Sequence, residues 1–262
     1  MSVHNLLRFY GAHIDPNVSG WFYGQDIVAF HTLNGIQMNA GIHGDICELG
    51  CFHGKSAIAL SHLARPEERL HVYDTFGDGY YESFRSNMAR YAQGLEGRLV
   101  INTMELSSLQ APPEDSLPRG TVRFLHIDAG HTHKDVINDL RNFAPLMAPG
   151  GIIALDDFYH HQFPGVATAG TEFMLSPEGQ HLRPFAGTHY KLYLCDRLWL
   201  KFYQKWIYRS KVIPTLSLYN ILDVDMLVCF SDEPWSDERL KAAFDDPAFG
   251  AEAAMGSPST SP

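Results

Sequence analysis

Short hydrophobic runs alternate with amphipathic segments along the chain from residue 45 onward. Hydrophobic runs short enough to be buried strands occupy 45–50, 69–76, 98–104, 122–129 and 152–157. The segments between them have hydrophobic residues at helical spacing and predict helices over 55–64, 80–95 and 133–147, the last ended by the sequence APGG. Such alternation is typical of a parallel sheet covered by helices on both faces. The pattern therefore predicts an α/β fold with a doubly wound, mostly parallel sheet.

The two ends of the chain follow other patterns. Residues 1–43 contain one clearly helical stretch and predict an N-terminal helical cap on a core of residues 44–196. Within that core, residues 185–196 form a strand pair, which predicts an antiparallel edge strand. Residues 197–247 form an aromatic and basic appendage, and the small, polar residues 248–262 predict a disordered tail.

Composition narrows the function classes. Hydrophobic residues make up 45% and charged residues 19% of the 262 residues, as in an ordinary globular protein with a sizeable core. The net charge of −10 argues against nucleic-acid binding, which depends on clustered cations.

Targeting signals and cysteines point to the cytoplasm. The first residues lack the basic start and apolar core of a signal peptide, and no 18-residue apolar run predicts a membrane span. The sparse cysteines predict reduced core residues: Cys47, Cys51, Cys195 and Cys229. We therefore expect a cytoplasmic protein.

A glycine-rich turn follows the first strand. Glu48, Gly50 and Gly54 form an E-x-G-x-x-x-G pattern between a strand and a helix. Glycine lets the backbone approach a ligand closely, and a helix N-terminus favours an anionic group. The pattern is neither the G-x-G-x-x-G of a dinucleotide site nor a P-loop, so by itself it is equally compatible with a tight turn that binds nothing.

The next two strand ends strengthen the ligand interpretation. Asp74 ends the second strand, where an acid can hold a ribose hydroxyl pair. Met104 and Glu105 follow the third strand, where an adenine would lie against the chain. Three consecutive strand ends therefore fit a ligand that carries adenosine.

Carboxylates gather at the ends of the fourth and fifth strands. Asp128 ends one strand, and Asp156 and Asp157 end the other. If the strands are neighbours, the three carboxylates converge and repel, and a divalent cation relieves that repulsion. Oxygen ligands suit Mg²⁺, which can lower the pKa of a bound hydroxyl. His131, three residues after Asp128, is placed to accept the hydroxyl proton.

These motifs carry a family resemblance. DICELGCFHGKSAIAL, VYDTF and FLHIDAGH…APGGIIALDDF resemble the class I S-adenosylmethionine-dependent methyltransferases. The likeness covers roughly residues 44–196 and is strongest to metal-dependent O-methyltransferases of macrolide sugars and to cephalosporin-hydroxylase-like proteins. It implies a Rossmann-like methyltransferase fold and an O-methyltransferase whose acceptor is a small molecule or sugar.

The resemblance also implies roles for particular residues. Cofactor contacts are expected from the glycine turn, the helix after it and the next strand ends: Glu48, Gly50, Gly54, Ser56, Asp74, Met104 and Asp128. The D-x-x-H spacing implies a metal ligand at Asp128 and a base at His131, and the acid pair Asp156–Asp157 fits the remaining metal ligands.

Three alternatives remain open at this point. His131 or His160 with two carboxylates imitates the two-histidine, one-carboxylate site of a non-haem iron hydroxylase. A methyltransferase can also work without metal. A catalytically silent cofactor-binding module is the third alternative, although binding alone does not need so concentrated a cluster of charge.

The appendage begins with a predicted amphipathic helix. Arg197, Lys201, Lys205 and Arg209 recur every four residues beside an aromatic face. This stripe could face an acidic or glycan-bearing substrate or a membrane surface. Alternatively, the aromatic face packs on the core or on a second subunit, which would make the protein a homo-oligomer, while the cations stay solvated.

Overall fold

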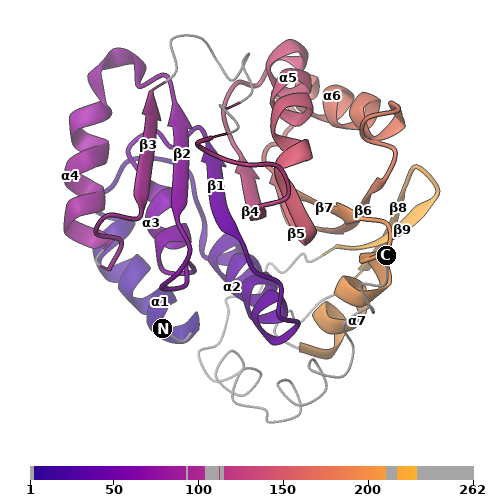
Figure 1. The fold of residues 1–262 in the computed structure, drawn as a ribbon, viewed down its shortest axis with the longest axis horizontal. Coiled ribbons are helices and arrows are strands. Elements are labelled where there is room, and N and C mark those ends of the chain that lie inside the picture. Colours follow the sequence, from indigo (N-terminus) through magenta and orange to yellow (C-terminus); the bar gives the residue numbers. More distant parts are fainter. Residues whose placement is uncertain (1–2, 93, 104–111, 113–114, 211–216, 229–262) are drawn as a thin grey trace.

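A computed structural model describes residues 3–92, 94–103, 112, 115–210 and 217–228. In this part of the chain, nine strands form one sheet in the order β3-β2-β1-β4-β5-β7-β6-β9-β8 (Figure 1). The strands from β3 to β5 are mutually parallel. Their bounds are β1 Asp45–Leu49, β2 Leu70–Asp74, β3 Leu99–Thr103, β4 Val122–Ile127 and β5 Met147–Leu155. All five predicted strands are therefore present, and the predicted doubly wound α/β class is confirmed.

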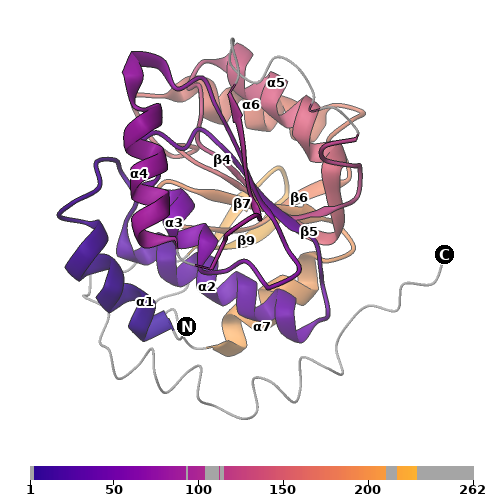
Figure 2. The same cartoon turned by 60° about the vertical axis from the view of Figure 1, so that its left-hand side comes forward.

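Helices cover both faces of the sheet (Figures 1 and 2). One face carries α1 Val3–Phe9, α2 Gly24–Asn39, α3 Lys55–Ser61, α4 Tyr81–Tyr91 and α7 Leu200–Ser210, whose apolar side chains share one core cluster. The other face carries α5 His133–Phe143 and α6 Pro164–Leu175, which share a second cluster. Because β1, β2, β4 and β5 are buried on both faces, their sequences read as continuous apolar runs.

The predicted hairpin is confirmed. Strands β6 Leu182–Gly187 and β7 Leu192–Asp196 pair antiparallel, and β7 also pairs antiparallel with β5. The turn between β6 and β7 therefore lies at the same edge of the sheet as the end of β5. Two further strands extend the sheet: β8 Ser217–Ile221 and β9 Val224–Val228, of which β9 runs parallel to β6.

Three features differ from the sequence-based expectation. Helix α6 and the strands β8 and β9 were not predicted. The sequence APGG does not separate a helix from a strand but lies inside β5, where the register with β4 shifts. Gly150 has φ +77°, a backbone conformation that glycine adopts readily, so the strand can bulge there without breaking.

The structure distinguishes between the functions predicted for the basic, aromatic segment that begins the appendage and contains helix α7. Trp199, Phe202, Tyr203 and Trp206 are buried, whereas Arg197, Lys201, Lys205 and Arg209 are exposed. The Tyr203 hydroxyl donates a hydrogen bond to the Gly150 carbonyl, which ties the helix to β5. The aromatic face therefore packs on the core, and the cations are solvated. Residues 229–262, including the predicted tail, lie outside the described residues.

Candidate functional site

A cavity of about 700 Å³ lies at the carboxyl ends of β1, β2, β4 and β5. Its wall is completed by the segment before α2 and by the turn between β6 and β7. Ligand pockets typically measure about 300–1,000 Å³ and occur at this edge of open α/β sheets. The cavity is therefore where the sequence placed the site.

The glycine turn after β1 is held by one carboxylate. Asp74 Oδ2 accepts hydrogen bonds from the backbone N–H groups of Cys51 (2.7 Å) and Phe52 (2.9 Å). Asp74 Oδ1 accepts from the Phe76 N–H (2.8 Å) and the Tyr80 hydroxyl (3.0 Å). A carboxylate offers about four lone-pair positions, so these four donors fill them. Asp74 lines the cavity, but its first role in this structure is to fix the loops around it.

The two glycines of the turn serve different contacts. Gly50 lines the cavity with φ +77°, and a Cβ there would lie 1.9 Å from the Asp128 carbonyl oxygen. The turn after β1 and the end of β4 therefore touch at Gly50. Gly54, for which we predicted a cofactor contact, is not among the residues that line the cavity. A Cβ there would meet Phe84 of α4 at 3.1 Å, so this glycine allows α3 and α4 to pack closely.

The other predicted cofactor residues divide into three outcomes. Ser56, at the start of α3, lines the cavity as expected. Glu48 does not: its side chain is fully buried and accepts from, or shares a proton with, His126 Nδ1 at 2.8 Å. Side chains of a strand alternate between its two faces, so Glu48 points into the core, where it contacts His126 of β4, and does not line the cavity. Met104 and Glu105 lie outside the described residues.

The acid cluster converges as predicted. The paired β4 and β5 strands bring Asp128, Asp156 and Asp157 to the cavity wall. Burial, reinforced by the neighbouring Asp156, raises the pKa of Asp128. Burial and the Asp156 charge also raise the pKa of Asp157. The pKa of Asp156 instead lies below its usual range, because the Lys191 ammonium and His126 outweigh the effect of burial.

Lys191 is the residue that sequence reasoning missed. It lies on the cavity wall beside the start of β7, is 1% exposed, and forms an ion pair with Asp156. Its charge also faces Asp26, a buried acid of α2, and Asp128. A lysine within the predicted hairpin was visible in the sequence, but nothing there indicated that it would be buried against these acids.

His131 lies within the same group. Its Nε2 is 3.1 Å from Asp157 Oδ2 and 3.9 Å from Asp128 Oδ1. The nearby Asp128 carboxylate raises the pKa of His131 against the effect of burial, and the Asp157 charge acts in the same direction. The side chain remains 38% exposed, so it can meet a ligand in the cavity.

Aromatic rings form a continuous arc that ends at His131. Ring contacts run from Tyr23 to Tyr190 (6.2 Å), to His160 (5.0 Å), to Phe163 (4.8 Å) and to His131 (4.1 Å). The residues come from four different segments, and all of them line the cavity. Such an arc places aromatic rings along the cavity wall, beside the acids.

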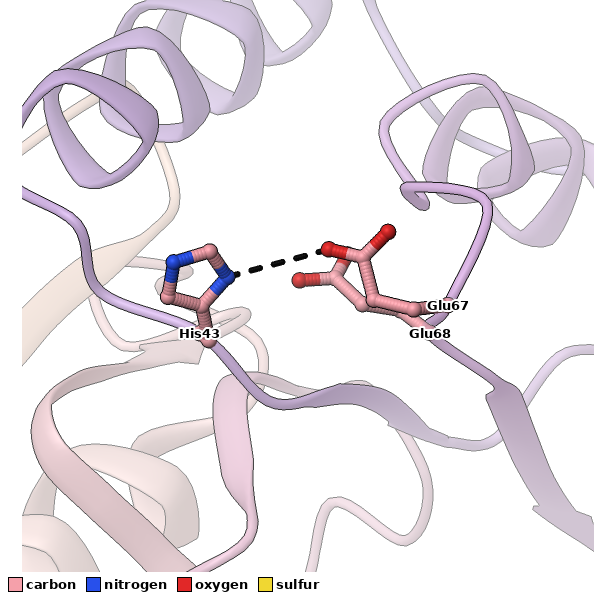
Figure 3. Close-up of side chains that lie close together, drawn as sticks. All are labelled: His43, Glu67 and Glu68. Atoms are coloured by element: carbon pink, nitrogen blue, oxygen red, sulfur yellow. Dashed lines mark ion pairs between the residues drawn. The ribbon is translucent and has the colours of Figure 1, made fainter.

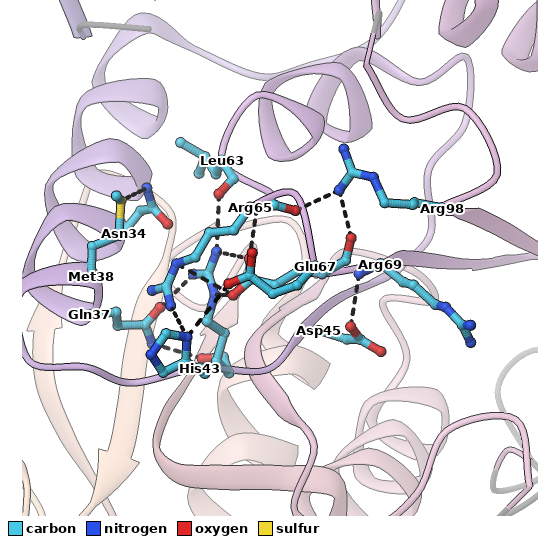
Figure 4. A network of polar contacts seen from close by, with 12 residues as sticks. Asn34, Gln37, Met38, His43, Asp45, Leu63, Arg65, Glu67, Arg69 and Arg98 are labelled. Atoms are coloured by element: carbon cyan, nitrogen blue, oxygen red, sulfur yellow. Dashed lines mark hydrogen bonds and ion pairs between the residues drawn. The ribbon is translucent and has the colours of Figure 1, made fainter.

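A second group of ion-binding residue types lies elsewhere. His43, Glu67 and Glu68 come together before β1 and β2, at the opposite edge of the sheet from the cavity (Figure 3). Glu68 is held by Arg123 at 2.7 Å from both Nε and Nη2, and Arg65 Nη1 lies 2.8 Å from His43 Nδ1 (Figure 4). These arginines supply the positive charge that the acids need, so the group is a structural ion network.

Part of the chain matches a known protein family. Residues 47–158 match the family model of a methyltransferase domain. This likeness to a methyltransferase domain spans less than half of the chain. No curated protein matches the chain in sequence. The matched residues run from β1 through the acid pair at the end of β5, so the domain includes the glycine turn and the acid cluster.

Solved structures share the fold of this methyltransferase domain. The O-methyltransferase NovP is 18% identical, with 64% of this chain and 78% of NovP covered and a TM-score of 0.51. An O-methyltransferase from Bacillus cereus in complex with SAH is 16% identical, with 73% of this chain and 88% of that chain covered and a TM-score of 0.51. At these identities the likeness establishes the fold, and it confirms the predicted Rossmann-like methyltransferase architecture.

The cysteines and the absence of a predicted membrane span were two further expectations. Cys47, Cys51 and Cys195 are buried and free, as predicted, while Cys229 lies outside the described residues. Among the helices of the described residues, none is long and apolar enough to cross a membrane.

Proposed function

We propose that this methyltransferase uses S-adenosylmethionine to methylate a hydroxyl group of a small molecule or sugar. One observation carries the proposal: a single cavity joins the glycine turn after β1 to the acid and histidine cluster after β4 and β5. The first part fits an adenosine-bearing cofactor, and the second fits an acceptor that must lose a proton.

The cofactor half offers backbone and polar side chains. Gly50, Cys51, Ser56 and Thr75 line it, and Asp74 keeps the turn in place. S-Adenosylmethionine would supply a methyl group already activated on a sulfonium, so the protein has to bind, orient and exclude water. The Bacillus cereus O-methyltransferase of the same fold was solved with SAH, which supports this choice of cofactor.

The acceptor half offers a proton acceptor. An acceptor hydroxyl placed against the His131 ring can pass its proton to the imidazole. Asp157 and Asp128 lie close enough to stabilise the imidazolium that results. The aromatic arc lies beside His131 and would pack against the acceptor, because sugars and aromatic rings both pack on aromatic side chains.

Magnesium remains part of the proposal at two of its three predicted ligands. Asp128 and Asp157 offer oxygen atoms that, with a His131 nitrogen, lie within 4.8 Å of one another. Oxygen donors suit Mg²⁺, which would lower the pKa of an acceptor hydroxyl. Asp156 also lies within 4.8 Å of Asp128 and His126 in a group of this kind. It fits less well, because one oxygen pairs with Lys191 and the other accepts the Asp157 N–H at 2.8 Å.

The alternatives are separated by specific contacts. Among the described residues, no group of three possible metal ligands contains two histidines, and none contains His160, which disfavours a two-histidine iron site. The Lys191–Asp156 pair favours a second candidate, methyl transfer without a divalent cation, since a protein cation already neutralises one acid.

Calorimetric titration with S-adenosylmethionine tests the proposal. We expect binding by the wild type and a large loss in Asp74→Ala, because three backbone N–H groups and the Tyr80 hydroxyl lose their acceptor. Asp45→Asn is the matched control, since Asp45 also holds backbone and side-chain donors but lies at the opposite edge of the sheet. Absence of binding by the wild type would refute the proposed cofactor.

A further inference from the structure

Lys191 is an unusual feature of the acid cluster, because lysine is almost never fully buried unless it is paired. Its side chain is 2% exposed and pairs with an Asp156 side chain that is 10% exposed. The ammonium also lies 5.5 Å from the Phe22 ring centroid. The cation is thus held from β5 by a carboxylate and from the segment before α2 by an aromatic face.

The charge balance around Lys191 explains why it stays protonated. Burial alone would lower the pKa of the ammonium, but Asp156, Asp26 and Asp128 raise it above its usual range. Asp26 comes from α2, Asp128 follows β4 and Asp156 follows β5. The single charge of Lys191, at the start of β7, therefore interacts with acids from α2 and from the ends of two strands.

Each oxygen of Asp156 has a partner in this arrangement. One oxygen pairs with Lys191 and the other accepts the Asp157 N–H. A divalent cation that used Asp156 would have to displace the ammonium or lie beside it, and two positive charges at such a distance repel strongly in a buried site. Asp128 shares a hydrogen bond with Asp156, but the ion pair of Lys191 is with Asp156, and both Asp128 and Asp157 approach His131.

We propose that Lys191 is a positioning residue that acts as the resident cation of the acid cluster: its ammonium holds Asp156 and keeps this carboxylate out of divalent-cation binding. Asp128 and Asp157 are then the two carboxylates that face a metal and an acceptor. The proposal rests on the proposed function only in that this cluster is taken as the acceptor site.

Titration of the full-length protein with Mn²⁺ alone tests this assignment. Replacing both members of the pair, in Lys191→Met/Asp156→Asn, should leave the Mn²⁺ dissociation constant within about threefold of the wild-type value, because the pair carries no net charge and gives the ion no ligand. Lys191→Met should bind Mn²⁺ roughly tenfold or more tightly, because Asp156 becomes an additional charged ligand. Adding Asp156→Asn to Lys191→Met should remove this gain.

The controls separate the assignment from simple structural damage. Lys201→Met removes an exposed lysine of α7 and should not change Mn²⁺ affinity. Damage to the fold would weaken metal binding, whereas the proposal requires a gain. If Lys191→Met does not fold, the comparison of wild type with the double variant still decides. Loss of Mn²⁺ affinity in a folded double variant, or no gain in a folded Lys191→Met, would overturn the proposal.

Titration of the same variants with S-adenosylmethionine distinguishes this inference from the proposed function. If the wild type binds no S-adenosylmethionine but Lys191→Met gains Mn²⁺ affinity through Asp156, the inference stands and the proposed function fails. If S-adenosylmethionine binds but the Mn²⁺ pattern is absent, the reverse holds.

Discussion

The two halves of the cavity satisfy their polar groups in opposite ways. On the β1–β2 side, one carboxylate, Asp74, receives four hydrogen bonds from the loops around it. On the β4–β5–β7 side, Asp26, Asp128, Asp156 and Asp157 surround one buried ammonium. The first half is a set of matched donors and acceptors, and the second has more negative than positive charge.

The difference shows where ligand chemistry can enter. The Asp74 half of the cavity has its loops fixed by hydrogen bonds, which suits the binding of a cofactor that is the same in every reaction cycle. A half with unbalanced acids has raised pKa values at Asp128, Asp157 and His131, and groups with perturbed pKa values are typical of reacting sites. Under the proposed function, cofactor binding and proton transfer take place in different halves of one cavity.

The largest effect is expected where the halves touch. Gly50→Ala would place a Cβ 1.9 Å from the Asp128 carbonyl oxygen at φ +77°. We expect a loss of more than about 4 kcal/mol in unfolding free energy, or failure to fold, because backbone on both sides must move. Gly41→Ala has a similar φ of +68° but open space, and should cost only about 1–2 kcal/mol. Urea unfolding of both variants measures this, and equal losses would contradict the contact.

The next effect concerns chemistry on the acidic side alone. His131→Gln should lower the rate constant of methyl transfer by about 10²–10⁴-fold, which is typical for loss of a general base. Affinity for S-adenosylmethionine should not change, because His131 belongs to the other half. Release of the demethylated cofactor with a panel of hydroxylated acceptors reports the rate. His133→Gln, which removes an exposed histidine paired with Glu172, is the control. Equal rates in wild type and His131→Gln would exclude the base.

Asp139, a buried acid outside the cavity, shows how burial affects a carboxyl group that has no cation beside it. Among the described residues, both carboxylate oxygens of Asp139 on α5 lack a hydrogen-bond partner. Burial, with a smaller effect from Asp135, raises its pKa to about 8. The folded state therefore binds more protons than the unfolded state between about pH 4 and pH 8, and stability falls as pH rises through this window.

Asp139→Asn should remove that loss. We expect the variant to exceed the wild type in unfolding free energy at pH 8 by about 1–3 kcal/mol, and by less at pH 5. Urea unfolding at both pH values measures the difference, and the exposed Asp115→Asn should show no such change. A wild type whose stability does not fall between these pH values would contradict the buried, neutral carboxyl.

The smallest effect concerns the aromatic arc. Tyr190→Ala interrupts the ring contacts between Tyr23 and His160. Aromatic contacts are worth about 0.5–1.5 kcal/mol, so KM for the acceptor should rise by roughly 2- to 12-fold while kcat stays nearly constant. Tyr208→Ala, an exposed aromatic residue of α7, should leave KM unchanged. A change in kcat alone would assign Tyr190 a different role.

Prediction from the sequence succeeded where local pattern and function coincide. Buried parallel strands are mostly apolar, so the five parallel strands and the acids at their ends were recognisable. It failed for β8 and β9, whose mostly exposed residues lack that pattern. Glu48 was assigned to the cofactor because it belongs to the motif, but the alternation of side chains along β1 turns it toward His126.

The sequence by itself determined the order of strands and helices, the glycine turn and the three carboxylates at strand ends, because these depend on residues close together in the chain. Only the tertiary structure decided that Asp74 is saturated by loop donors and that Lys191 enters the acid cluster. Lys191 reaches Asp156 because β7 runs antiparallel beside β5, which brings the start of one strand to the end of the other. Whether a charge at a strand end meets a metal or another side chain depends on such long-range pairing, and no local pattern records it.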